Sequence, residues 1–402
     1  MGKITHADIG TQLTKTEWEA NTTHLDSQGN ILEVSRSAIL VVAASDASAK
    51  SKAGADYVCD GTADDVEIQA ALDALPSVGG TVVLSEGTFT LAATVTFNSF
   101  RTLIGAGLRA TKITSASDIT LLKILNNTYS TTIGRLWLYG YAKGVANVSM
   151  GIEFGATTDK IYWTRLYDLF IENCRKGISI KSAYKPQTFS SLHLENNYDG
   201  IVFEDGTYTS ELMLSDSRIL YCDNIGIYIY RKASGVQLNN IEISSCVTGI
   251  RVEDLYWAHF NQVLCDSNQR NYWLEVSTLI KGVQFSNCWA GAATYEHMKI
   301  TGCSKILLSN MQIRPGGSKG IAVSGSNEIT ITGGQISELS SYGIDLANCN
   351  DCVVVGIRVT GCDTGLVESG TSNYNTIVGN NFRGNTNPIV IVGVNTINQH
   401  NQ

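Results

Sequence analysis

The chain has 402 residues, of which 43% are hydrophobic, and it carries a formal net charge of -8 with a pI near 5.3. This acidic balance argues against a surface that binds nucleic acid or anionic membranes, and no run of about 18 apolar residues predicts a transmembrane helix. The 38 Gly and only 4 Pro residues are typical of many tight turns between strands that use every backbone N–H.

Residues 1–36 differ from the remainder and form the first of two predicted segments; residues 37–402 form the second. The first segment lacks the apolar core of a secretory signal peptide. A capping box from Thr14 to Glu17 predicts a short helix through Trp18 and Ala20. This segment is either a loosely ordered leader or an attachment segment, for example to a virion or a sister subunit.

The next part of the chain predicts a helix among short strands. A strand begins at residues 39–42, and Asp64 is a good N-cap residue with Glu67 three positions later. The helix is expected over about 65–75, with one apolar face. Two short strands follow at 81–84 and 88–91. We expect such a helix to cover the open end of a stack of strands, where unpaired edges would otherwise aggregate.

The motifs in this part resemble a known family. D-G-T-A-D-D, then E-I-Q-A-A-L-D-A-L, G-G-T-V-V-L, E-G-T-F and L-I-G-A-G, between Asp60 and Gly107, are similar to the opening of pectate-lyase-superfamily proteins, particularly phage tailspikes and depolymerases. The resemblance implies a right-handed parallel β-helix with an N-terminal capping helix, and it implies a homotrimer. It does not specify an activity, because the family includes lyases, hydrolases, epimerases and non-enzymatic fibres.

The stretch from Arg165 to Asp254 carries a repeat that dominates the chain. Alternating apolar and polar residues lead to a small or amide residue, then to Gly-Ile and a second alternating run. Such self-similarity predicts a stacked repeat, and two strands per repeat favour an all-β solenoid over a leucine-rich repeat. The Gly-Ile marks include Gly151, Gly177, Gly200, Gly226, Gly249, Gly320 and Gly343, with Gly365-Leu366 last.

Two further patterns concern the core. Five of the ten cysteines (Cys174, Cys222, Cys246, Cys265 and Cys288) fall near one repeat position, which predicts reduced, buried thiols and no metal. Adjacent Asn pairs, such as those at Asn197 and Asn380, predict amide ladders. Near the end of the chain, residues 389–392 predict a strand that is buried on both faces.

Aligning the repeats on Gly-Ile predicts columns of outward residues about 4.8 Å apart. One column reads Ser179, Val202, Tyr228, Arg251 and Trp273, and the next reads Lys181, Glu204, Tyr230, Glu253 and Glu275. Carboxylates, an Arg and aromatic rings together suit a carbohydrate.

This first patch has three candidate catalytic residues, Glu204, Arg251 and Glu253. Tyr228, Tyr230 and Trp273 are its candidate substrate-binding residues. Glu253 and Glu275 would be about 5 Å apart, near the separation of a retaining glycosidase. In a lyase, Arg251 would neutralise a uronate, with Tyr228 or His259 as base. The alternative is ordinary solvated surface.

A second patch lies on the strand before the turn. Glu172 and Glu195 align one coil apart as candidate catalytic residues, with His193 beside them as a substrate-binding residue. Stacked like charges raise one carboxyl pKa, as an acid catalyst requires, unless Arg175 or Lys176 relieves them.

The sequence therefore predicts an extracellular or virion protein that binds a polysaccharide and degrades it as a lyase or glycosidase, without a cofactor. The alternative is a non-enzymatic adhesive fibre of the same fold; a free microbial lyase or epimerase is a third possibility. The sugar is not specified.

Overall fold

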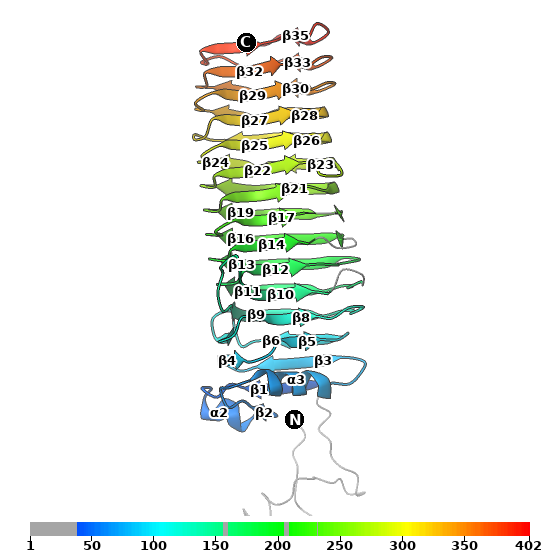
Figure 1. Cartoon of the computed structure of the whole chain (residues 1–402), viewed down its shortest axis with the longest axis vertical. Helices are drawn as coiled ribbons and strands as arrows, with labels where there is room; N and C mark the ends of the chain where they lie inside the picture. The colour runs from blue at the N-terminus through cyan, green and yellow to red at the C-terminus, as the bar shows by residue number, and fades with distance from the viewer. Residues whose placement is uncertain (1–37, 156–159, 205–208, 231) are drawn as a thin grey trace, which may run out of the picture.

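The computed structural model describes residues 38–402, except 156–159, 205–208 and 231. The predicted leader of residues 1–36 and its short helix lie outside the described residues. The remainder is the predicted all-β solenoid, a parallel β-helix of about 14 turns whose coils stack along one axis (Figure 1). No helix in the described part is long and apolar enough to span a membrane.

One side of the solenoid is a 13-stranded sheet, which includes the runs that follow the Gly-Ile marks. Its strands pair in parallel with their neighbours, and Ile178, Ile201, Ile227 and Ile250 stack in register and point into the core. The strands are β5 Val95–Phe97, β8 Thr120–Ile124, β10 Met150–Phe154, β12 Lys176–Ile180, β14 Asp199–Phe203, β17 Ile225–Ile229, β20 Thr248–Val252, β22 Arg270–Glu275, β25 Glu296–Thr301, β27 Lys319–Ser324, β29 Tyr342–Ala347, β32 Thr364–Ser369 and β34 Asn387–Val390.

The remaining strands form a 22-stranded sheet. They are β1 Ile39–Ala43, β2 Tyr57–Val58, β3 Gly80–Leu84, β4 Gly87–Leu91, β6 Arg101–Ile104, β7 Thr111–Ser115, β9 Thr132–Tyr139, β11 Arg165–Glu172, β13 Gln187–Glu195, β15 Thr209–Ser210, β16 Leu212–Leu220, β18 Ala233–Ser234, β19 Gln237–Ser244, β21 Leu255–Asp266, β23 Ile280–Ser286, β24 Trp289–Gly291, β26 Ser304–Ile313, β28 Asn327–Ser337, β30 Val353–Val355, β31 Arg358–Thr360, β33 Thr376–Val378 and β35 Ile397–Gln399.

Left-handed residues bend the long strands of this sheet. Asp168, Ser191, Asp216 and Asn240 occupy equivalent places in successive coils, each with φ between 48° and 54°. Asn, Asp and Gly tolerate this conformation better than bulky residues. The bend divides each long strand in two, so that residues after it, such as Glu172 and Glu195, face a different direction from those before it.

The Gly at each Gly-Ile mark is required by close approach between coils. A Cβ added at Gly200 would lie 2.3 Å from the carbonyl oxygen of Gly226, and one at Gly226 would lie 2.7 Å from that of Gly249. No side chain fits between these backbones. The repeat mark therefore has a steric cause.

Buried Asn side chains at several turns bond to the backbone of a neighbouring coil. Asn197 and Asn268 accept the backbone N–H of Cys174 and Cys246 in the preceding coil, at 2.9 and 2.8 Å. Asn380 does the same for Ile357 and also donates to the Asn401 side chain. These asparagines therefore have the structural role predicted for them, mainly through bonds to the backbone of a neighbouring coil.

All ten cysteines are buried and free, which confirms the predicted reduced thiols. Their positions differ from the prediction in one respect. Cys265 pairs in register with Ile243, and Cys288 directly precedes Trp289, which pairs with Leu264. Cys265 lies within β21, and Cys288 lies at the bend between β23 and β24. Neither lies at the turn before Gly-Ile, because bends and insertions change the length of individual coils.

Helix α3 spans Asp65–Ala74 at the N-terminal end of the stack, as the sequence predicts (Figure 1). Ile68 and Leu72 are buried in the core. Asp64 precedes the helix but makes no capping hydrogen bond; its carboxylate accepts the N–H groups of Gly61 and Thr90 instead. The role of α3 as a cap stays a prediction. A second, short helix, α2, spans Ala49–Ala53.

The prediction of a doubly buried strand at residues 389–392 is wrong. Strand β34 ends at Val390, and Val390 and Val392 are 42% and 51% exposed. Among the described residues β34 is an edge strand that pairs only with β32, so only one side is packed. The apolar composition predicted a strand, but it could not predict that this strand has a paired strand on one side only.

Candidate functional site

The first predicted patch assembles on the 13-stranded sheet in the predicted register. Tyr228, Arg251 and Trp273 pair in sequence on β17, β20 and β22. The Arg251 guanidinium lies 4.4 Å from the Trp273 ring centroid and 5.3 Å from that of Tyr228. Cation–π contacts therefore hold the guanidinium between two rings, and the Tyr230 ring lies 5.5 Å from that of Tyr228.

The carboxylates of this patch already have partners. One oxygen of Glu253 lies 2.6 Å from the Arg251 guanidinium and accepts the Tyr228 hydroxyl at 2.6 Å. Glu204 is paired with Lys176 and accepts the Ser179 hydroxyl. Glu275 lies 3.5 Å from Lys299. Such paired charges are more typical of a stabilised surface than of a substrate-binding site.

Two of the proposed bases do not suit this patch. Burial, followed by the hydrogen bond to Glu253, raises the pKa of Tyr228 well above its usual value, so the phenol would not accept a proton near neutral pH. His259 lies on β21 of the 22-stranded sheet, paired with Gln237 and Gln284, and not beside Arg251 on β20. His259 was predicted here because it is close to Arg251 in sequence, but the coil turns between them and places the two residues on different sheets.

The second predicted patch lies on the 22-stranded sheet after its bend. Glu172 and Glu195 are register partners on β11 and β13, and Phe170 and His193 are partners two residues earlier. The His193 Nε2 atom lies 3.1 Å from a carboxylate oxygen of Glu195. Glu172, His193 and Glu195 are each partly exposed. The structure therefore brings all three predicted residues of this patch together.

Neighbours absent from the prediction complete this second patch. The Trp137 indole N–H donates to Glu172 at 3.1 Å. Arg109 lies 4.3 Å from the Phe170 ring centroid and covers it, and Lys112 lies 4.3 Å from that of Trp137. The long insertion between Gly140 and Arg165 hides the alignment of these residues, which only the strand register of β7, β9 and β11 reveals.

The titratable groups of the second patch have divergent environments. Burial raises the pKa of Glu172, the Trp137 hydrogen bond opposes this, and the charge of Glu195 reinforces it. Burial lowers the pKa of His193, as do Arg218 and Arg109, against the opposing effect of Glu195. Arg175 and Lys176 do not relieve the carboxylates, since they pair with Asp199 and Glu204. A carboxyl whose pKa is raised, on the strand next to a second carboxyl, suits acid–base chemistry.

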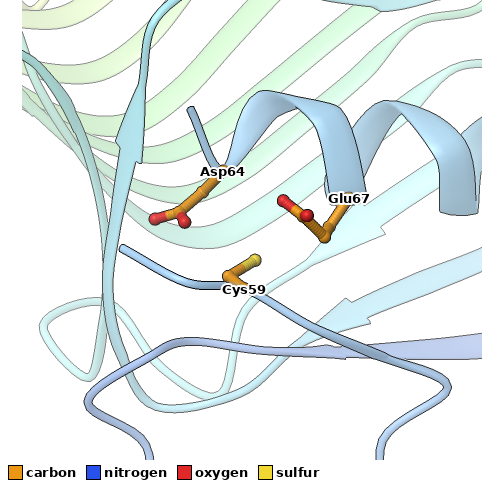
Figure 2. A group of neighbouring side chains, drawn as sticks. All are labelled: Cys59, Asp64 and Glu67. Atoms are coloured by element: carbon orange, nitrogen blue, oxygen red, sulfur yellow. The ribbon is translucent and has the colours of Figure 1, made fainter. Parts of the chain in front are cut away.

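One cluster of metal-ligand type lies at the N-terminal end. The thiol of Cys59 and the carboxylates of Asp64 and Glu67 lie within 4.8 Å of one another, around the start of α3 (Figure 2). Both carboxylate oxygens of Asp64 already accept backbone N–H groups. Burial raises the pKa of both Cys59 and Asp64, which favours their protonated forms. We assign this cluster to the junction between helix and solenoid rather than to a metal.

The fold and these surfaces place the chain among the parallel β-helix proteins of pectate-lyase type. The model of the family described as "Rhamnogalacturonase A/epimerase, pectate lyase-like" matches residues 53–292, more than half of the chain. The chain belongs to this family. A model described as "Periplasmic copper-binding protein (NosD)" matches residues 259–402. A search of curated proteins found no match.

Solved structures support the fold. The A-module of mannuronan C-5 epimerase AlgE4 from Azotobacter vinelandii is 16% identical with a TM-score of 0.62, over 84% of this chain and 97% of the module. DFA-IIIase from Arthrobacter chlorophenolicus A6 is 10% identical with a TM-score of 0.62, over 89% and 98%. Gene product 12 of bacteriophage phi29 is 14% identical with a TM-score of 0.65, over 78% of this chain and 50% of that one. At these identities the likeness establishes the fold alone.

Proposed function

We propose that this protein binds a polysaccharide across the second patch, formed by Glu172, His193 and Glu195 with Trp137, and cleaves it by acid–base catalysis. The observation that carries the proposal is the pairing of Glu172, whose pKa is raised, with Glu195 on the neighbouring strand. Family membership supports a carbohydrate as the substrate.

The roles follow from the chemistry of each group. Glu172 donates a proton to the glycosidic oxygen, so it must enter the reaction protonated. Glu195 supplies the second carboxylate, and His193 positions it. Strands about 4.8 Å apart place carboxyl groups near the separation of about 5–5.5 Å typical of retaining glycosidases. The first patch, with Arg251 and Glu253, is the second candidate site.

The assembly and location remain part of this proposal. We propose an extracellular or virion protein, tailspike-like and trimeric, with residues 1–36 as its attachment segment. The phage neighbour and the periplasmic description of the second family model support an environment outside the cytoplasm. Light scattering coupled to size exclusion tests the trimer; a monomer across the micromolar range would contradict it.

Activity is tested by incubating the protein with a panel of bacterial and plant polysaccharides. New reducing ends with no ultraviolet absorbance indicate a hydrolase, and absorbance at the unsaturated-uronate band indicates a lyase. We expect Glu172→Gln and Glu195→Gln each to lower the rate by roughly 10²–10⁴, and Glu328→Gln, an exposed carboxyl beside Lys305, to have no effect.

Two outcomes would contradict the proposal. Full activity in both Glu172→Gln and Glu195→Gln would remove the second patch from catalysis. Binding without any product from the panel would favour the adhesive fibre.

A further inference from the structure

A depression of about 320 Å³ lies on another part of the molecule, at the corner where coils enter the 22-stranded sheet. Aromatic side chains line its two ends. Tyr184 and Lys185 form one end, and Tyr256 and Trp257 form the other. Its volume falls at the lower end of the range for ligand sites, about 300–1,000 Å³.

The register of the coils explains this shape. Ala183 pairs with Thr209, and Ser210, Ser234 and Tyr256 then align in successive coils. Three strand spacings of about 4.8 Å put the two aromatic ends roughly 14 Å apart. The two coils between them contribute the small residues Ser210, Ser234 and Gly235, with Glu211 at the edge. The floor is therefore low and polar between two aromatic walls.

The walls are held in place by neighbouring side chains. The Tyr184 ring contacts the Tyr162 ring edge-on at 5.7 Å, and Lys160 lies 4.4 Å from its centroid. At the other end, a Cβ added at Gly282 would lie 3.1 Å from the Trp257 indole, which therefore rests on that glycine. Preorganised walls reduce the entropy lost when a ligand binds.

Trp257 exposes a large apolar ring at one end of the depression. It has φ 55° and is 65% exposed, a combination that is unfavourable for a bulky apolar residue. Glycines occupy the equivalent left-handed positions of the adjacent coils, at Gly235 and Gly282. Lys305 occupies the same column one coil further on with φ 56°, so the backbone accepts other residues here. What distinguishes Trp257 is that its exposed ring lines the depression.

We propose that this corner depression is a second carbohydrate-binding site, which holds a short oligosaccharide segment of the polymer. The flat apolar face of a pyranose ring matches Trp257 and the tyrosines, and its hydroxyls match Lys185, Glu211 and the serine floor. A peptide or membrane partner would favour a continuous apolar or single-signed surface, whereas here one Lys and one Glu flank a polar floor. The inference rests on the proposed carbohydrate specificity and not on the catalytic role of Glu172.

The site is tested by affinity electrophoresis of the full chain in gels containing polygalacturonate, rhamnogalacturonan I, alginate or dextran. All proteins carry Glu172→Gln so that the glycan stays intact. We expect at least one glycan to retard the protein, and Trp257→Ala to weaken that binding about tenfold or more. Trp257→Phe, which keeps a ring, is expected to bind at an intermediate strength.

The matched control is Tyr374→Ala. Tyr374 has φ 54° and is 60% exposed in a later coil, so its replacement removes a comparable exposed ring outside the depression; binding should be unchanged. Circular dichroism verifies that each variant is folded. Retardation of the Trp257→Ala variant equal to that of the parent, or no retardation of the parent by any of the four glycans, overturns the inference.

These outcomes separate the two proposals. Loss of binding in Trp257→Ala together with full activity in Glu172→Gln would support the corner site and reject the catalytic patch. The reverse pair of results would reject the corner site alone.

Discussion

Single residues decide which of the two predicted patches is chemically available. Glu253 and Glu204 are bonded to cations and hydroxyls on their own sheet. Glu172 instead accepts a hydrogen bond from an indole and has Glu195 as its register partner on the neighbouring strand. A charge that is fully paired stabilises a surface, whereas a carboxyl beside another carboxyl has its pKa raised and binds a proton more readily.

The pH dependence of activity follows from the surroundings of Glu172. The groups facing it are Glu195, Arg109 and Lys112, with the Trp137 indole as donor. Since Glu172 acts as the acid, activity should fall as the pH rises through its raised pKa. The indole hydrogen bond lowers that pKa, so Trp137→Phe should move the alkaline limb of kcat to higher pH.

A full pH–rate profile on the best substrate of the panel measures this shift. Trp289→Phe is the control, because Trp289 lies in the same outward column several coils away. An alkaline limb that stays in place, or moves to lower pH, in Trp137→Phe would exclude Glu172 as the acid.

Glu253 is expected to matter for stability rather than for catalysis. The Nε atom of Arg251 is already buried without a hydrogen-bond partner. Replacing Glu253 by Gln removes the charged partner of the same guanidinium. We expect unfolding to become easier by roughly 1–3 kcal/mol, with activity retained. Chemical denaturation and the reducing-end assay measure the two effects.

Glu242→Gln is the comparison for this variant. Its pair with Arg218 is more exposed, so the loss should stay below about 1 kcal/mol. A large loss of activity in Glu253→Gln would move the catalytic assignment to the first patch.

At the scale of the element, the repeat is held together by contacts between equivalent positions of successive coils. Gly200→Ala should destabilise the fold by about 1–3 kcal/mol, as expected for overpacking, because its Cβ would lie 2.3 Å from the Gly226 carbonyl oxygen. Gly107→Ala, whose Cβ would make an ordinary 3.6 Å contact with Ala110, should be nearly neutral. Thermal unfolding compares the two, and equal melting temperatures would mean that the coils can separate locally.

At the scale of the whole molecule, the solenoid encloses every cysteine. All ten thiols are buried, and burial raises the pKa of Cys174 to about 12 and that of Cys288 to about 11. Native protein should therefore react with a thiol reagent at pH 8 far more slowly than unfolded protein. Unfolded protein should consume ten equivalents of the reagent per chain. Rapid reaction of several thiols in the native state would show that coils open readily.

Much of the fold was predictable because a solenoid is built from local, repeated signals. The Gly-Ile marks predicted a second strand in each marked repeat and its outward columns, and the register of Tyr228, Arg251 and Trp273 confirms the columns. Prediction failed where a coil changes length, as at Cys265 and Cys288, and where a strand lacks a neighbour, as at Val390.

The sequence by itself determined the stacked coils, the buried ladders and the two groups of residues that could carry chemistry, because alternation and glycine spacing act within each coil. Only the tertiary structure decided how those groups are used. Lys176 and the Tyr228 hydroxyl, each from the preceding coil, bond to Glu204 and Glu253 respectively. The register between β9 and β11 places Trp137 beside Phe170 and within hydrogen-bond distance of Glu172. Such partners are distant in sequence, and their contacts depend on register between coils, which no local pattern specifies.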